Sequence, residues 1–467
     1  MKKLLRIIRK ADFTDKLQLR GSRRRDIGLV TVGLAICAAL ACVSLPKAAC
    51  RHLYSLTGDS GTHQPQPYYA SVTSLDFFRY VSTNTGIPAS RSLDYLLSDG
   101  NVARLSLDQD LQLHLYNFLE KKKVPYAIFV AVEPRTGRIL ANVSYSAASS
   151  SWGSRASFNP YPMASLFKIV TAAAAFESGK FNSTTSLSFR GASCSESPSS
   201  WGKPGRSRDA RMQLNDAMAH SVNPAFGRLA GDRLGGPLLF ATAQRFGLGA
   251  NLFGSDLIHS GKISLPSTNG ELMRMAAGLD HSVRTSPFHV AMMLAAIGNG
   301  GVMPVPSFVD AVDDRQGNNL YSFRAAPLAT ITSPAVAEEL VRSMSGTVCS
   351  GTAKRAFADP EALRFRNEIA VAGKTGSING DDPAGHYNWF AGIAPAANPS
   401  IAFAALVVNE NRVRVRASQV GRAALDIFFS ADKKNGDQAF IKGNRSPSIS
   451  SYSKPLEKTA ALKHEKQ

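Results

Sequence analysis

The sequence predicts an α+β domain in which an antiparallel sheet is flanked by helices, with an all-helical subdomain beside it. Residues 127–133 and 139–143 alternate in hydrophobicity well enough for a β-hairpin around a Pro-Arg-Thr-Gly turn. Helical patterns fill the middle of the chain. Three more strands and a closing amphipathic helix follow them, at residues 369–374, 388–393, 401–409 and 419–429. This order favours one mixed domain whose functional site lies between the sheet and the helical subdomain.

The length and composition allow one large domain with a sizeable core. The chain has 467 residues, 44% of them hydrophobic and 19% charged, as in ordinary globular proteins. Its formal net charge is +19, of which the first 26 residues carry +7 and residues 432–467 carry +4. The remaining charge suits contact with an anionic membrane or polymer. We expect no nucleic-acid binding, no metal and no cofactor, because the sequence contains no zinc spacing, paired-histidine motif or phosphate-cradling glycine loop.

An apolar segment near the N-terminus predicts a membrane anchor. Residues 27–45 are nineteen residues without a charge, and a helix of that length spans about 28 Å. The basic leader, residues 1–26, predicts a cytoplasmic N-terminus and an extracytoplasmic remainder. A cleaved signal peptide and a lipoprotein are less favoured alternatives. Lys47 spoils the small-residue cleavage pattern, and neither Cys42 nor Cys50 follows a suitable lipidation sequence.

The remainder of the chain divides into three expected regions. Residues 46–104, rich in turn-forming residues with weak helical patterns, predict a short stalk or linker. Residues 105–431 form the expected globular domain, and residues 432–467 a basic polar tail that is expected to be disordered. Cys194 and Cys349 are the two cysteines of the globular domain, and we favour two unpaired buried thiols over a disulfide.

Three short strings carry the candidate chemistry and stand in one order along the chain. They are Ser165-Leu166-Phe167-Lys168, Ser221-Val222-Asn223 and Lys374-Thr375-Gly376-Ser377. The first pattern is weak alone, because S-x-x-K recurs in unsuitable contexts at Ser44, Ser200, Ser430 and Ser451. Ser165 alone begins an apolar helical run, so that its lysine follows one turn later on the same face.

Local context assigns each string to a different kind of element. The helical run 166–178 stops at Gly179, a residue suited to end a helix. The Ser221 string lies in a short loop between two helical patterns, the second of which opens with a proline. The Lys374 string ends an apolar stretch, residues 369–372, that predicts a buried strand. Small residues around it leave room for a substrate backbone against the strand edge.

Together these strings resemble the penicillin-binding protein transpeptidase domain of the serine penicillin-recognising enzyme superfamily. Five further segments carry the likeness, at residues 105–112, 131–141, 285–301, 351–353 and 388–392. Residues 162–164 and 279–281 depart from the usual family pattern. These departures bear on substrate preference more than on reaction type. The resemblance implies a β-lactamase/transpeptidase-like fold, class B-like but without a large pedestal domain.

The resemblance also implies catalytic roles. Ser165 would be the nucleophile and Lys168 its general base, with a pKa lowered by burial and by a second nearby cation. Ser221 would relay a proton to the leaving group, and Asn223 would hold a substrate amide. Lys374 would bind the terminal carboxylate of the substrate.

Substrate binding is implied for the residues that follow Lys374. Thr375 would share the carboxylate, while Gly376 and Ser377 would leave room for the substrate backbone. The backbone N–H groups of Ser165 and Ser377 would form the oxyanion hole.

The expected function is that of a membrane-anchored peptidoglycan D,D-transpeptidase, with its catalytic domain on the periplasmic side of the cytoplasmic (inner) membrane. It would cross-link stem peptides through an acyl-serine intermediate and be acylated by β-lactams. A glycosyltransferase of the wall-synthesis machinery is an expected partner. The alternatives are a D,D-carboxypeptidase, a class D type β-lactamase and a non-catalytic β-lactam-binding wall-assembly protein.

Overall fold

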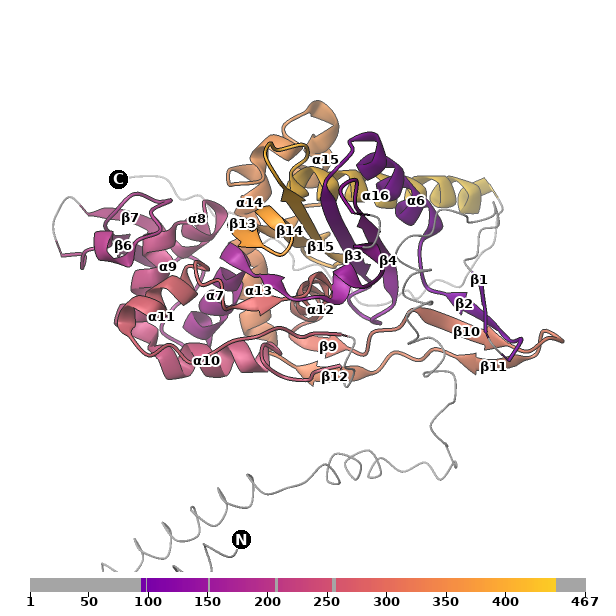
Figure 1. Cartoon of the computed structure of the whole chain (residues 1–467), viewed down its shortest axis with the longest axis horizontal. Coiled ribbons are helices and arrows are strands. Elements are labelled where there is room, and N and C mark those ends of the chain that lie inside the picture. Colours follow the sequence, from indigo (N-terminus) through magenta and orange to yellow (C-terminus); the bar gives the residue numbers. More distant parts are fainter. Residues whose placement is uncertain (1–93, 98, 150–151, 206–208, 254–257, 442–467) are drawn as a thin grey trace, which may run out of the picture. The chain divides into compact units, whose positions relative to one another are not determined.

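The computed structural model describes residues 94–441, except residues 98, 150–151, 206–208 and 254–257 (Figure 1). All described residues belong to one compact unit, residues 67–467. The expected leader, the expected membrane helix, most of the stalk and residues 442–467 of the tail lie outside the described residues. Within the described ranges, no helix combines the length and the apolar character needed to cross a bilayer.

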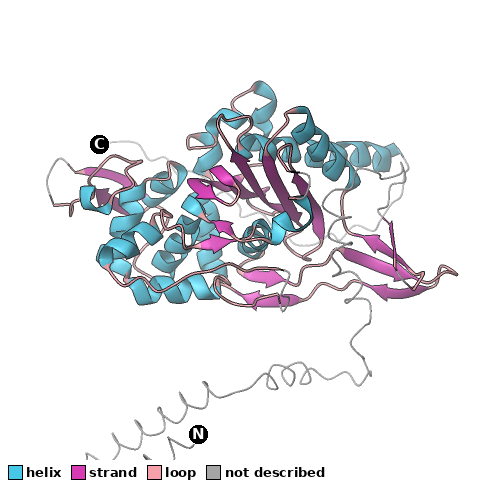
Figure 2. Cartoon of the chain, in the orientation of Figure 1, coloured by secondary structure: helices cyan, strands magenta, loops and turns pink. Residues whose placement is uncertain are grey.

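The centre of the domain is a five-stranded antiparallel sheet with the strand order β13-β14-β15-β3-β4 (Figures 1 and 2). Its strands are β3 Tyr126–Val132, β4 Ile139–Tyr145, β13 Ala372–Asp381, β14 Ala384–Ala394 and β15 Ile401–Asn409. The expected hairpin is confirmed as β3 and β4, with Gly137 at φ +87° in the turn between them. The predicted strands at 388–393 and 401–409 are confirmed as β14 and β15.

The strand that carries Lys374 differs from the prediction. The sequence placed it at residues 369–374, with the K-T-G string at its end, but β13 begins at Ala372 and continues to Asp381. The string therefore lies in the first half of the strand. Three glycines in β13 weaken the strand signal in the sequence, whereas pairing with β14 along its full length supports the strand in the fold.

Helices cover both faces of this sheet because alternate residues of each strand point to opposite sides. Ile128, Val130 and Val132 of β3 join the core cluster that contains helix α12, Pro287–Gly298. The residues between them join a second cluster with α6, Gln109–Lys121, and α16, Ala417–Ile441. Helix α16 is longer than the amphipathic helix expected at 419–429. It extends into the first residues of the expected tail.

The helical subdomain that the sequence predicts is present beside β13. Its helices are α7 Phe167–Glu177, α8 Leu214–Ala219, α9 Asn223–Leu229, the π-helix η5 Ala230–Leu234, α10 Gly236–Arg245, α11 Asn269–Ala276, α13 Pro334–Met344 and α14 Gly346–Cys349. Shorter helical turns connect these elements, namely η2 Gly153–Phe158, η3 Ala164–Leu166, η4 Pro198–Ser200, η6 Lys354–Phe357, η7 Pro360–Leu363 and α15 Arg364–Asn367. Helix α7 ends at Glu177, and Gly179 shortly after it has φ +68°, the left-handed conformation expected of the glycine that stops this helix.

Smaller sheets, which the sequence analysis did not predict, complete the described fold. A four-stranded sheet joins β1 Asp94–Leu96, β2 Val102–Leu105, β10 Val309–Asp313 and β11 Asn319–Ser322. Three two-stranded sheets pair β9 Val302–Pro304 with β12 Pro327–Thr330, β5 Tyr161–Pro162 with β8 Arg284–Thr285, and β6 Ser186–Phe189 with β7 Ala210–Gln213. Residues 94–96 and 102–104, expected in the stalk, thus contribute to a sheet of the globular domain.

Candidate active site

Ser165 lies in the short turn η3, directly before helix α7. The preceding residue, Ala164, has φ +52°, a left-handed conformation that costs free energy for a residue with a side chain. Gly278 packs against this turn so closely that a Cβ there would lie 2.1 Å from the Ala164 carbonyl oxygen. The backbone around Ser165 is thus held in a fixed, strained turn, and the serine keeps 9% of its surface exposed.

The Lys168 amine lies beside the Ser165 hydroxyl, one helical turn away. Its Nζ is 2.8 Å from Ser165 Oγ, 2.8 Å from Asn223 Oδ1 and 2.6 Å from the Ala277 carbonyl oxygen. The side chain is fully buried. Burial, and secondly the charge of Lys374, lower the pKa of Lys168 well below its usual value. A neutral amine at this position can take the proton of the serine hydroxyl.

Ser221 lies in the inter-helix loop that the sequence predicts, whereas Asn223, expected in the same loop, lies just inside the helix that follows. Ser221 has φ +56° in the connection between α8 and α9, and Asn223 is the first residue of α9. The Asn223 amide donates to the Ser195 carbonyl oxygen at 3.1 Å, so both ends of this side chain are held. The two residues therefore lie on the helical side of the site, with Asn223 against Lys168.

Lys374 joins β13 to the Ser221 loop. Its Nζ donates to Ser221 Oγ at 2.9 Å and to the Thr375 carbonyl oxygen at 2.8 Å. The side chain is fully buried, and burial lowers the pKa of Lys374 to about 7. Ser221 therefore stands next to one of the two buried amines, where it can pass a proton.

The rest of the K-T-G string runs past the nucleophile along the unpaired edge of the main sheet, because β13 is its terminal strand. A Cβ added to Gly376 would lie 3.2 Å from Ala164 Cβ and 3.4 Å from Ser165 N, so a larger residue would crowd this approach. Ser377 is exposed, and its hydroxyl accepts from the Asn388 amide at 3.1 Å. A substrate backbone can pair with such an edge.

Thr352 is a site residue that sequence reasoning missed. Its hydroxyl lies 2.5 Å from the hydroxyl of Thr375, and its backbone N–H donates to the Ala219 carbonyl oxygen at 3.0 Å. A Cβ on Gly351 would lie 2.2 Å from the same carbonyl, which makes glycine necessary for this close approach. The segment 351–353 was noted only as part of the family likeness, and its contact with Thr375 comes from the tertiary fold.

Two other contacts of the site were also invisible in the sequence. The Ala277 carbonyl, which binds Lys168, and the Ser195 carbonyl, which binds Asn223, are backbone groups of loops. Any residue type can supply a carbonyl, so no side-chain signal marks these positions.

The cysteine prediction is confirmed in one respect and wrong in another. Cys194 and Cys349 are both unpaired, as favoured, but both are exposed rather than buried. Cys349 ends the short helix α14, and Cys194 lies in the loop between β6 and η4. Each position is therefore at the surface of the helical subdomain.

The serines of the competing S-x-x-K strings occupy other surroundings. Ser200 is exposed in η4, where its hydroxyl donates to the Ser197 carbonyl at 2.7 Å. Ser430 lies in α16, and its hydroxyl donates to the Asp426 carbonyl. Ser44 and Ser451 lie outside the described residues. Of the described candidates, Ser165 is the serine that contacts a buried lysine.

Relatives of this chain are found over most of the globular domain. A family model described as the penicillin binding protein transpeptidase domain matches residues 127–428. Peptidoglycan D,D-transpeptidase PbpA of Mycolicibacterium smegmatis is 28% identical over 323 residues, which cover 60% of this chain and 61% of the relative. Stage V sporulation protein D of Bacillus subtilis is 25% identical over 328 residues, 65% of this chain and 49% of the relative. The match spans less than two thirds of the length of each.

Solved structures agree with this fold. Penicillin-binding protein A from M. tuberculosis, in an imipenem acyl-enzyme complex, aligns with a TM-score of 0.59 at 24% identity, covering 71% of this chain and 80% of that chain. A crystal structure of PBPA from Mycobacterium tuberculosis aligns with a TM-score of 0.57 at 25% identity, covering 70% and 82%. These alignments confirm the expected α+β transpeptidase fold. With a family model covering more than half of its length, the chain belongs to the penicillin-binding protein transpeptidase family.

Proposed function

We propose that this protein is a peptidoglycan D,D-transpeptidase that works through an acyl-serine intermediate. One observation carries the proposal: the fully buried Lys168 amine lies 2.8 Å from Ser165 Oγ, and burial lowers its pKa. A serine hydroxyl is a poor nucleophile until a base takes its proton. A lysine that is neutral at working pH supplies that base without a histidine or a metal.

The first half of the reaction forms the acyl-enzyme. Lys168 takes the hydroxyl proton as Ser165 Oγ attacks the carbonyl carbon of a D-Ala-D-Ala amide. The backbone N–H groups of Ser165 and Ser377 stabilise the resulting oxyanion. Lys168 then returns this proton by way of the Ser221 hydroxyl, which Lys374 holds at 2.9 Å, to the departing amine of D-alanine. The carbon–nitrogen bond breaks and an ester to Ser165 remains.

Substrate recognition in this proposal uses the opposite walls of the site. Protonated Lys374 and the Thr375 hydroxyl bind the terminal carboxylate, and the edge of β13 near Gly376 receives the peptide backbone. Asn223 holds a substrate amide. In the second half of the reaction an amine of a neighbouring strand attacks the ester carbonyl, an amide forms, the bond to Ser165 Oγ breaks, and the proton lost by the amine is returned to Ser165 through Lys168. A D,D-carboxypeptidase would use water at this step.

The cellular setting is part of the same proposal. Residues 27–45 anchor the chain in the cytoplasmic membrane, with the basic leader inside and the catalytic domain on the periplasmic side. Peptidoglycan stem peptides and β-lactams are its ligands, and a wall-synthesis glycosyltransferase is a partner that would supply new glycan strands.

A fluorescent penicillin tests the proposal directly. We expect the wild-type chain to form a covalent adduct that persists through denaturing electrophoresis, and Ser165→Ala to form none. Ser200→Ala is the matched control, since Ser200 begins a competing S-x-x-K string, and it should label normally. Rapid release of hydrolysed penicillin over many turnovers would instead identify a β-lactamase, and full complementation of a deletion strain by Ser165→Ala would identify a non-catalytic role.

A further inference from the structure

A second cavity lies in the helical subdomain, on helix α9 and separate from Ser165. It has a volume of about 850 Å³ and is lined by strand β6, helix α9, the π-helix η5 and the segments 180–181 and 203–204. Helix α9 begins at Asn223, whereas Arg228 and Leu229 at its other end line the cavity. The cavity and the candidate active site thus share one short helix.

The lining of this cavity is strongly cationic. Lys180, Lys203, Arg228 and Arg233 line it, against one carboxylate, Asp232. Arg228 is largely buried and binds Asp232 through two hydrogen bonds, so these two charges compensate each other. No ion pair to a described residue engages the other three cations. An excess of three positive charges around one cavity favours a ligand with several anionic oxygens.

Strand β6 forms one wall of the cavity, and its backbone offers hydrogen-bonding groups to a ligand. Four successive residues, Thr185 to Ser188, line the cavity, and β6 pairs with β7 alone in a two-stranded sheet of the described residues. In an antiparallel pair, alternate residues direct their N–H and C=O groups away from the partner strand. The free edge of β6 can therefore bind a ligand that is itself an extended peptide.

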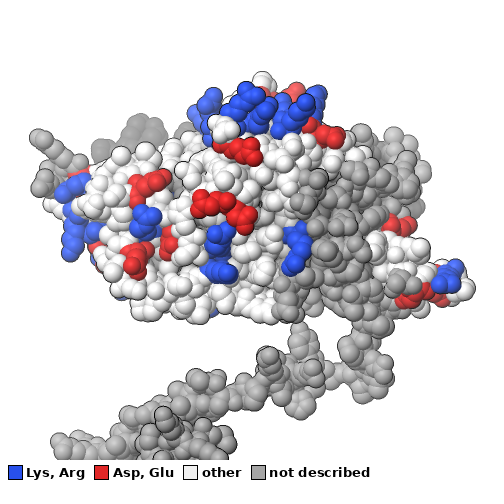
Figure 3. Space-filling view, viewed as in Figure 1, with Lys and Arg blue, Asp and Glu red and all other residues white. Residues whose placement is uncertain are grey.

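We propose that this cavity binds an extended, carboxylate-bearing peptide segment. Its backbone would pair with the edge of β6, and its carboxylates would lie near Lys180, Lys203 and Arg233. The proposal rests on the proposed function, because an enzyme that joins two peptide strands must hold both, and the Ser165 site accounts for one. Figure 3 shows Lys and Arg side chains at the end of the domain where β6 and β7 lie, which would attract such a strand.

The test measures binding of a short fluorescent peptide with alternating glutamate and alanine residues. The peptide is amidated at its C-terminus, so that it offers no terminal carboxylate to Lys374. Fluorescence anisotropy is recorded on the full-length Ser165→Ala protein in mild detergent, with the glutamine version of the peptide for comparison. We expect the double substitution Lys180→Glu with Lys203→Glu to weaken binding about tenfold.

A matched charge change serves as the control. Lys121→Glu with Lys122→Glu, at the exposed end of α6, alters the net charge equally and should leave the affinity unchanged. Equal loss in both double variants, or equal binding of the glutamine peptide, would overturn the proposal. Tighter, cavity-dependent binding of a glycerol phosphate oligomer than of the peptide would overturn it in favour of a phosphate polymer. Penicillin labelling of Ser165 is scored separately, so the two proposals can fail independently.

Discussion

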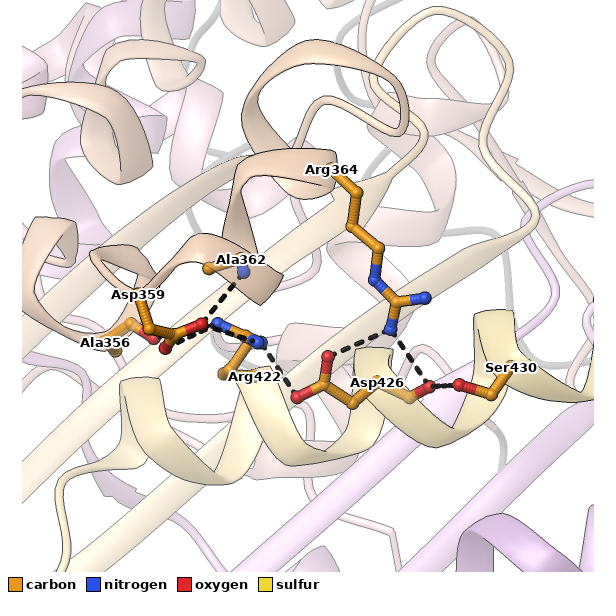
Figure 4. Close-up of polar contacts among 7 residues, drawn as sticks. All are labelled: Ala356, Asp359, Ala362, Arg364, Arg422, Asp426 and Ser430. Carbon is orange, nitrogen blue, oxygen red and sulfur yellow. Dashed lines mark hydrogen bonds and ion pairs between the residues drawn. The ribbon is translucent and has the colours of Figure 1, made fainter.

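Two regions of this molecule treat buried cations in opposite ways. Between α16 and the segment 354–367, Arg422 is 9% exposed and binds two carboxylates, Asp359 and Asp426 (Figure 4). In the candidate active site, Lys168 and Lys374 are fully buried, and among the described residues their amines contact neutral oxygens of hydroxyl, amide and carbonyl groups. The charge of Arg422 is compensated by two carboxylates, whereas Lys168 and Lys374 pair with no carboxylate of a described residue.

This difference in charge compensation distinguishes a buried cation with a structural role from buried lysines with a chemical role. A buried charge without a carboxylate favours its neutral form, and this lowers the pKa of both lysines. A neutral amine can act as a base, whereas the guanidinium of Arg422 keeps two segments of the chain together. Figure 3 shows Lys and Arg at the surface near α15, with Asp and Glu beside them.

The largest expected effect is that of Lys168→Met on acylation. Removing the base should lower the second-order rate of penicillin acylation by about 10²- to 10⁴-fold. Stability should change by less than about 1 kcal/mol, because relief of a buried amine offsets the loss of a donor to Asn223 and Ala277. Stopped-flow penicillin labelling measures the acylation rate, and urea unfolding measures the change in the free energy of unfolding.

Lys121→Met is the control for that variant, since Lys121 is exposed at the end of α6 and contacts neither the Ser165 site nor the cationic cavity. It should acylate at the wild-type rate. Two results would assign a structural role to Lys168 in place of a catalytic one. The acylation rate of Lys168→Met would fall by less than about tenfold, or the variant would unfold far more easily than the wild type.

The opposite result is expected for Arg422→Met. Removing the guanidinium takes away the cationic partner of Asp359 and leaves Asp426 paired with Arg364 alone. It also loses the contact with the Phe365 ring at 5.3 Å. Both carboxylates are partly exposed, at 54% and 38%, so water replaces part of the interaction. We expect a loss of about 2 kcal/mol in the free energy of unfolding, while acylation stays near the wild-type rate.

An exposed arginine provides the matched control. Arg342 is 51% exposed and binds Glu338 and Glu339 on the surface of α13. Arg342→Met should cost less than about 0.5 kcal/mol. Equal destabilisation by the two substitutions would mean that the Arg422 cluster behaves as an ordinary surface network.

Features set by neighbouring residues were predictable from the sequence. The three-residue spacing brings Lys168 to Ser165, the apolar run after it forms α7, and glycine ends that helix where expected. The β3–β4 hairpin has the same local origin. The resemblance to the family then predicted that the three strings lie together in the fold. Their separation along the chain alone does not give the distances between them.

Features that depend on distant segments could not be predicted. Lys168 meets the Ala277 carbonyl 109 residues away, and Thr352 meets Thr375 through a loop with no motif of its own. That no carboxylate of the described residues pairs with the two lysines is likewise a property of packing. Sequence reasoning named the basic residues of the site, but the opposite treatment of Arg422 became visible only in three dimensions.

The smallest expected effect is a pH dependence that separates the two lysines of the site. Acylation needs Lys168 neutral, so the second-order rate rises with pH through the lowered pKa of Lys168. Carboxylate binding needs Lys374 protonated, and its pKa of about 7 makes the rate fall above that pH. For one proton the fall is about fivefold between pH 7 and pH 8. Measuring penicillin acylation from pH 5 to pH 10 should therefore give a bell-shaped profile.

Lys374→Arg identifies the falling side of that profile, because arginine keeps its charge throughout this range. We expect the variant to lose the decline above pH 7 even if its maximal rate is reduced by the larger side chain. Arg422→Met, by contrast, should leave the profile unchanged, since its carboxylate partners do not contact the site. A decline that persists unchanged in Lys374→Arg would assign it to another group. The uncompensated lysines would then no longer account for the pH response of the enzyme.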